Sequence, residues 1–152
     1  MTVRYFFSLV FAIIVFVLTN LISGLGLNFG WFLDFPSALI IIIIPSGFML
    51  ILHGWKDIRS AFSISRKKDT TEKELLNAKM FFEDYSKILF SIVFIGFIVS
   101  FIAMMFDLEV KEQLGPLLAV ASISLFYAGI INMVIIIPYK IIINKKIIEM
   151  KN

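Results

Sequence analysis

The chain has 152 residues, 60% of them hydrophobic, a net charge of +3 and a mean hydropathy of +0.97. Soluble domains of this size are nearer to half apolar, so the composition favours an integral membrane protein. The absence of cysteine excludes disulfides and thiolate chemistry, and a single histidine excludes histidine-based metal centres. The small net charge gives no reason to expect nucleic acid as a partner.

Four apolar blocks are long enough to cross a bilayer, which takes about 20 mostly apolar residues. We predict spans at about residues 5–23, 35–53, 87–106 and 116–138, within one membrane domain that covers 1–152. The first block is longer than the apolar core of a signal peptide, and a poor cleavage site follows it. The sequence therefore predicts an all-α membrane protein with four transmembrane helices.

The longest polar stretch, residues 54–86, separates the second and third spans. Thr70 or Thr71 followed by Glu74 is typical of a capping box, and the pattern after it predicts an amphipathic helix that runs straight into the third span. The apolar and basic end of the chain predicts that the last helix also passes the membrane surface. We expect the last two helices to be long and to extend into the cytoplasm.

Prolines mark the helices of the spans. Pro36 and Pro116 occupy first-turn positions, where the missing N–H does no harm, and Asp34 is suited to cap the helix that Pro36 opens. Pro45 falls inside the second span and predicts a kink, whereas Pro138 marks where the last span bends or leaves the membrane.

Lysine and arginine are unevenly distributed among the segments outside the spans. Residues 24–34 contain none and residues 107–115 contain only Lys111, but both the middle segment and the tail are rich in them. The positive-inside rule then predicts a multi-pass protein of the cytoplasmic (inner) membrane with both termini in the cytoplasm. The basic cluster 66–68 is expected to contact anionic membrane lipid.

The predicted spans contain no Asp, Glu, Lys, Arg or His at mid-depth. Such residues usually mark proton relays and transport sites, so an ion step would need a partner that brings the charge. No nucleophile–base pair, metal ligand set or buried acid is visible, and we expect neither enzymatic activity nor a cofactor.

Small and polar residues lie on one face of each of the last two spans. Gly96, Ser100 and Ala103 are spaced for one face of the third span. The corresponding sector of the fourth span contains Ala121, Ser122, Ser124, Ala128, Gly129 and Asn132. Such faces let helices approach closely. They fit either simple helix packing or the lining of a lumen around a foreign helix.

Two stretches carry a more specific pattern: FLDFPSALIIII at 32–43 and LGPLLAVASISLFYAGIINMVIIIP at 114–138. They resemble the opening of the second span and the whole last span of flagellar stator MotA proteins, and through them the wider MotA/TolQ/ExbB family. The four spans, the internal termini and the position of the cytoplasmic segment agree with that resemblance. The motif residues that carry it are Asp34, Pro36, Gly115, Pro116 and Pro138.

The resemblance implies a homopentameric ring whose third and fourth spans surround the single-span helices of a MotB/TolR/ExbD-like partner. That partner would bring the membrane aspartate, and ion flow would drive rotation or a mechanical stroke. The lumen-lining and partner-facing residues would be Gly96, Phe97, Ser100, Ala121, Ser122, Ser124, Leu125, Gly129 and Asn132.

The chain departs from the family in two respects. Phe97 and Leu125 occupy the positions where family members usually keep a threonine near the partner's aspartate, and neither side chain forms hydrogen bonds. The cytoplasmic segment is also far shorter than the torque-bearing domain of a flagellar stator. We therefore expect an ion-driven motor or energy-transducing subunit of another kind, or a non-conducting scaffolding oligomer with a packed or lipid-filled interior.

Overall fold

The described residues fold into helices only. The computed structural model describes residues 3–22, 33–64, 66–67, 69–106 and 111–151. They belong to two compact units, Met1–Asp34 and Phe35–Asn152. The prediction of an all-α protein is confirmed for this part of the chain.

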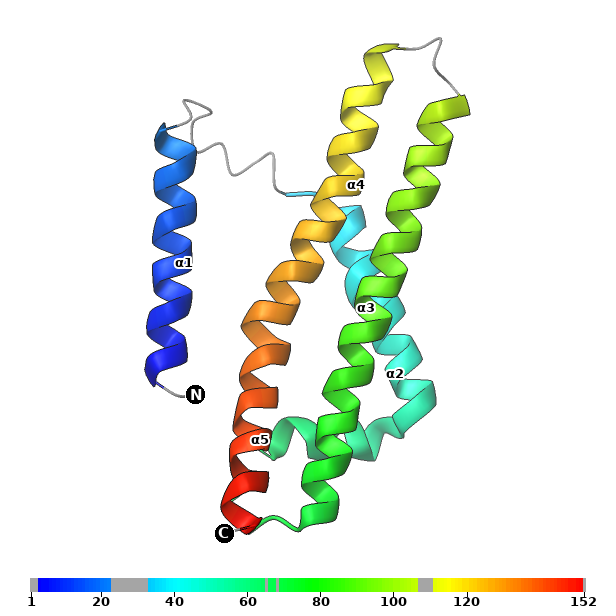
Figure 1. Ribbon diagram of the computed structural model, residues 1–152. Helices are drawn as coiled ribbons and strands as arrows, with labels where there is room; N and C mark the ends of the chain where they lie inside the picture. Colours follow the sequence, from blue (N-terminus) through cyan, green and yellow to red (C-terminus); the bar gives the residue numbers. More distant parts are fainter. Residues whose placement is uncertain (1–2, 23–32, 65, 68, 107–110, 152) are drawn as a thin grey trace. The chain divides into compact units, whose positions relative to one another are not determined.

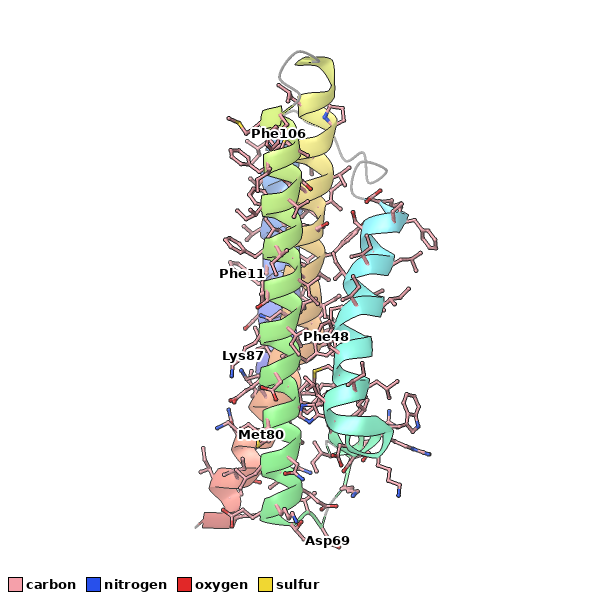
Figure 2. The ribbon with its side chains drawn as sticks, turned by 90° about the vertical axis from the view of Figure 1, so that its right-hand side faces the viewer. Phe11, Phe48, Asp69, Met80, Lys87 and Phe106 are labelled. Atoms are coloured by element: carbon pink, nitrogen blue, oxygen red, sulfur yellow. The ribbon has the colours of Figure 1, made fainter. Side chains whose placement is uncertain are left out.

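The described part of the first unit contains one helix, α1 (Val3–Ile22). No glycine or proline interrupts it, and large apolar side chains such as Phe7 and Phe11 are exposed within the unit (Figure 2). Thr19 donates its hydroxyl hydrogen to the Val15 carbonyl oxygen at 2.8 Å, so this polar group is satisfied by its own helix. A helix with so little polar surface requires lipid or protein around it.

The second unit consists of α2 (Phe35–Ser63), α3 (Glu72–Phe106), α4 (Lys111–Ile131), the π-helical segment η2 (Asn132–Ile136) and α5 (Ile137–Lys151). Figure 1 shows α3 running beside α4 and α5 for most of its length, with α2 packed next to them. The connection from α2 to α3 and the C-terminal end of α5 lie at the same end of this unit.

Three stretches of the described chain are long and apolar enough to cross a membrane: Phe35–Ser63, Glu72–Phe106 and Leu114–Met150. Most of their side chains are exposed, which is unfavourable in water and suits a hydrocarbon environment. The apolar part of α1, Tyr5–Thr19, is shorter than these three. The chain thus has the helices of a membrane-embedded protein.

Helix α2 is longer than the predicted span and has a bend that the sequence analysis does not predict. It continues to Ser63, ten residues past the predicted end of the second span at 53, and its one non-helical backbone conformation lies at Gly54 (φ 72°, ψ 162°). Pro45, where we predict a kink, lies inside the helix. A positive φ with an extended ψ is accessible almost only to glycine. Gly54 therefore lets Trp55–Ser63 turn away from the direction of the first part of α2.

The predicted capping box is confirmed at the start of α3. The Thr71 backbone N–H donates to Glu74 Oε2 at 3.1 Å, and the Glu74 backbone N–H donates to Thr71 Oγ1 at 3.3 Å. These reciprocal bonds satisfy donors that a helix start leaves open. The helix then runs without a break to Phe106, as predicted.

The last helix also continues past the apolar block, with a change of geometry before Pro138. In η2 the Ile137 N–H bonds to the Asn132 carbonyl, five residues back, which widens the turn. Apart from Pro138, the described residues that are buried along this helix are Ala121, Ala128, Ile136, which ends η2, and Ile143. Their spacing is seven, then eight, then seven, so the wide turn takes up one additional residue while the buried side stays continuous.

Candidate functional site

Four of the predicted site residues line one cavity, of about 180 Å³, between α2, α3 and α4. They are Gly96, Ser100, Ala121 and Ser124. The other lining residues are Ser37, Ile40, Ile41, Ile92, Val93 and Val120. We call these ten residues the small-residue site. Much of the predicted small-residue face therefore lies between helices of one chain.

The serine hydroxyls on these helices are bonded within their own helices. Ser100 donates to the Gly96 carbonyl at 2.9 Å, Ser122 to the Leu118 carbonyl at 2.8 Å, and Ser124 to the Val120 carbonyl at 3.4 Å. Bonds to the carbonyl four residues back are the usual way for a helix to satisfy a hydroxyl in an apolar setting. The site is therefore mostly apolar, and the hydroxyls of Ser100 and Ser124 already bond within their own helices.

The predicted residues Ser122, Leu125 and Gly129 lie on a neighbouring side of α4, outside that cavity. With 100° per residue, these residues and Leu118 fall within about 60° of one another around the helix axis. Ser122 is exposed, Leu125 is 37% exposed and Gly129 is half-buried. A Cβ added at Gly129 would meet nothing within 4 Å. We call Leu118, Ser122, Leu125 and Gly129 the α4 stripe.

The two remaining predicted lining residues have different surroundings. Phe97, on α3, is half-buried and is not among the residues that line the cavity. Asn132, at the start of η2, accepts a hydrogen bond on Oδ1 from the Ser86 hydroxyl of α3 at 3.0 Å. This bond joins the last helix to α3, and sequence reasoning did not find it.

The motif residues all lie at or near helix ends or changes of helix geometry. Asp34 directly precedes α2, and Pro36 is its second residue. Gly115 and Pro116 lie in the early turns of α4 rather than before it, because the helix already begins at Lys111. Pro138 is buried and follows η2 directly at the second position of α5.

Aromatic side chains gather at the opposite end of the second unit, where α2, α3 and α5 meet. The Phe82 ring stacks on Tyr139 with centroids 4.8 Å apart, and Phe62 meets the edges of both rings at 5.4 Å. Phe81 lies 5.1 Å from Phe82. We call Phe62, Phe81, Phe82 and Tyr139 the aromatic end.

Polar contacts between distant segments surround the aromatic end. The Lys146 ammonium donates to the backbone carbonyls of Ile64 at 2.7 Å and Lys67 at 2.6 Å, which ties α5 to the chain that leaves α2. His53 Nε2 lies 3.3 Å from Asp84 Oδ2, so α2 and α3 also meet through a polar pair. The sequence shows a basic tail and an interfacial histidine, but not these partners.

One carboxyl group near this end has a perturbed pKa. The Lys67 ammonium donates to Glu74 Oε1 at 2.9 Å, and this bond lowers the pKa of Glu74, with further help from the Thr71 N–H. Glu74 is therefore held in its charged form where it caps α3.

Within the described residues, no group of three or more His, Cys, Asp or Glu side chains is placed to hold a metal ion. Searches against protein-family models and curated proteins found no match to the chain. Membership of the MotA/TolQ/ExbB family stays a prediction from the two sequence stretches.

Proposed function

We propose that this chain is the ring-forming subunit of a MotA/TolQ/ExbB-like inner-membrane complex of the ion-driven motor or energy-transducing type. In this proposal five copies, each with four spans and cytoplasmic termini, surround the single-span helices of a partner that carries the membrane aspartate. The observation that carries it is the α4 stripe, a narrow face of small and medium residues that the other helices of the second unit leave exposed or half-exposed.

The physical argument rests on how helices associate in lipid. Lipid tails are as apolar as the side chains they touch, so association depends on close packing, and small residues permit it. The small-residue site already uses part of the α4 surface within the chain. The α4 stripe is the adjoining part, and it is available to further copies or to a partner helix.

An assembly measurement tests the ring. After purification in a mild detergent, native mass measurement is expected to give five copies, and a stable monomer or dimer would contradict the proposal. Gly129→Leu is expected to break the ring, because its side chain would fill the α4 stripe. Val99→Leu is the control on α3, because Val99 is 59% exposed and lies outside the small-residue site. If both variants still form the ring, the α4 stripe is not part of the interface between copies.

The transport step is expected to require the partner. Residues 35–52, 88–106 and 114–138 contain no Asp, Glu, Lys, Arg or His, so these stretches provide no charged carrier. Proton flux into vesicles that contain this chain alone should equal that of empty vesicles. Flux above that level would show that the ring conducts without a partner.

A non-conducting scaffolding oligomer is the second candidate, and the serine geometry favours it. Ser100, Ser122 and Ser124 bond to their own helices, and Leu125 adds an apolar side chain to the α4 stripe. Such a lining suits a packed or lipid-filled interior. Isolation from the native membrane separates the candidates: a bound single-span protein with a membrane aspartate supports the motor, whereas phospholipid alone supports the scaffold.

A further inference from the structure

A groove of about 460 Å³ lies in the bend of α2 and is separate from both the α4 stripe and the small-residue site. Its volume is within the range of ligand pockets, about 300–1,000 Å³. The first part of α2 lines it with Ile42, Ile43, Ser46, Gly47, Met49 and Leu50. The remaining lining residues are Trp55, Ile58, Phe62, Phe81, Phe82, Tyr85, Ile131, Ile135 and Ile136.

Gly54 creates this groove, because its positive φ turns Trp55–Ser63 and places both parts of α2 around one hollow. In the turned part, Ile58 and Phe62 line the groove and Ala61 is buried. Lys56, Asp57 and Arg59 are exposed. An apolar side with a charged opposite side is typical of a helix that lies in the membrane interface.

The charges of this short helix are separated around its axis. With 100° per residue, Arg59 lies about 40° from Trp55 and Lys56 about 100°, both on one flank, whereas Asp57 lies about 160° away on the other flank. Neither Lys56 nor Arg59 forms an ion pair with another described residue. Arg59 thus gives the groove a positively charged edge beside Trp55, which is 68% exposed, and Lys56 lies further from the lining on the same flank.

We propose that this groove binds one anionic phospholipid, with an acyl chain along the apolar lining and the headgroup phosphate at Arg59 and Lys56. The match is one of chemistry, since an amphiphile with a negative head complements an apolar hollow with a positive flank. Trp55 would lie at the boundary between the two, where indole rings are enriched in membrane proteins.

A peptide occupant fits less well. A helix about 10 Å across occupies roughly 420 Å³ per turn, so the groove holds about one turn. An extended peptide would bring backbone N–H and C=O groups that need partners in a dry site. Of the lining side chains only Ser46, Tyr85 and Trp55 carry a hydrogen-bonding group. An acyl chain makes no such demand.

Tryptophan fluorescence tests the proposal directly. Trp31→Phe leaves Trp55 as the single tryptophan of the full chain. The protein is reconstituted into phosphatidylcholine vesicles that contain equal mole fractions of acyl-brominated phosphatidylglycerol or acyl-brominated phosphatidylcholine. We expect stronger quenching of Trp55 by the anionic lipid, with a relative affinity about fivefold higher for each basic residue near the headgroup.

Three substitutions in that background separate the headgroup from the acyl chain. Arg59→Gln is expected to lower the preference for the anionic lipid about fivefold, whereas Lys145→Gln, which removes an exposed positive charge of α5, should leave it unchanged. Gly47→Leu is expected to reduce quenching by both brominated lipids, because its side chain fills the groove. Circular dichroism of each variant confirms that the helices are retained.

Several outcomes would overturn the proposal. Equal quenching by the two lipids would show that the groove does not prefer anionic lipid. An equal effect of Arg59→Gln and Lys145→Gln would show that any preference comes from the general positive charge of the surface. Quenching by neither lipid would mean that another copy of the chain or a protein partner covers the groove. The ring of five copies can fail or hold independently of each result, because it is measured by mass with Gly129→Leu.

Discussion

The aromatic end and the small-residue site both belong to the second unit but are built in different ways. At the aromatic end, large rings from α2, α3 and α5 contact one another, and Lys146 bonds to backbone carbonyls far away in the sequence. At the small-residue site, the side chains leave a cavity of about 180 Å³, and Ser100 and Ser124 bond to their own helices.

This difference concerns how each region is held together. At the aromatic end, rings and polar groups from distant segments contact one another, although Phe62, Phe81 and Phe82 also line the groove in the bend of α2. We therefore expect the aromatic end to carry most of the stability of the unit. The small-residue site and the adjoining α4 stripe leave surface for lipid, other copies or a partner. Substitutions at the aromatic end should therefore mainly lower the unfolding free energy. Substitutions at the small-residue site or the α4 stripe should change the unfolding free energy less and affect assembly instead.

The largest effect is expected for Phe82→Ala. The Phe82 side chain is 1% exposed and stacks on Tyr139, so its removal leaves a cavity and should lower the unfolding free energy by about 3–5 kcal/mol. SDS-driven unfolding in detergent micelles measures this change. Phe94→Ala is the matched control on α3, because Phe94 is 61% exposed, and it should change stability by less than about 1 kcal/mol. Equal losses of unfolding free energy in the two variants would contradict the proposal that the aromatic end carries most of the stability.

Lys146→Met is expected to have the next largest effect. The substitution keeps the length of the side chain but removes a charged donor from the Ile64 and Lys67 carbonyls, at a cost of about 1–3 kcal/mol. Lys145→Met removes only an exposed pair with Glu149, worth about 0.5 kcal/mol or less. The same unfolding measurement compares them, and a neutral Lys146→Met would show that the tail does not hold α2.

A pair of serine substitutions compares a bond between two helices with a bond inside the small-residue site. Ser86→Ala breaks the bond between α3 and Asn132, and hydrogen bonds between membrane helices are worth about 0.5–1.5 kcal/mol. Ser100→Ala removes only a bond within its own helix, and its effect should lie within about 0.5 kcal/mol. If Ser100→Ala lowered the unfolding free energy more than Ser86→Ala, Ser100 would make a stabilising contact at the small-residue site.

The smallest effect concerns pH. The pKa of Glu74 in the folded protein lies below its ordinary value of 4.5, because Lys67 and Thr71 donate to the carboxylate. The folded state therefore binds the proton less readily than the unfolded state, so this contribution is present above pH 4.5 and is lost as the pH falls through the lowered value.

The midpoint of thermal unfolding is measured across this window for the wild type and Glu74→Gln. The difference between the two proteins should be positive above the window and shrink as the medium becomes more acidic. A constant difference would show that the charge of Glu74 does not contribute through its capping bonds.

Features that depend on neighbours in the sequence were predictable. The capping box of Thr71 and Glu74 and the uninterrupted course of α3 into the membrane are confirmed because they arise from local donors and periodicity. The extension of the last helix beyond its apolar block is also confirmed, because it was predicted from the local pattern of apolar and basic residues. The continuation of α2 past Gly54 was missed, since Lys56, Asp57 and Arg59 resemble a polar loop unless Ile58, Ala61 and Phe62 are read together.

Features that depend on distant segments were not predictable. Nothing local connects Ser86 with Asn132, or Lys146 with the carbonyl of Ile64, because these pairs are 46 and 82 residues apart. The predicted small-residue faces are patterns on single helices, and such patterns do not show which helix each residue contacts. Ala121 is buried and Ser122 is exposed because α2 packs against one side of α3 and α4, and this packing is not visible in the sequence.

The wide turn of η2 changes how the last helix should be compared with other sequences. Before Asn132, inward positions recur at Ala121 and Ala128, and an uninterrupted seven-residue repeat would next select Ile135 and Ile142. The structure instead buries Ile136 and Ile143. An alignment without a one-residue gap at 132–136 would therefore assign every later side chain to the wrong face. Related chains that lack the wide turn are expected to be one residue shorter at this point, with the inward residues otherwise unchanged.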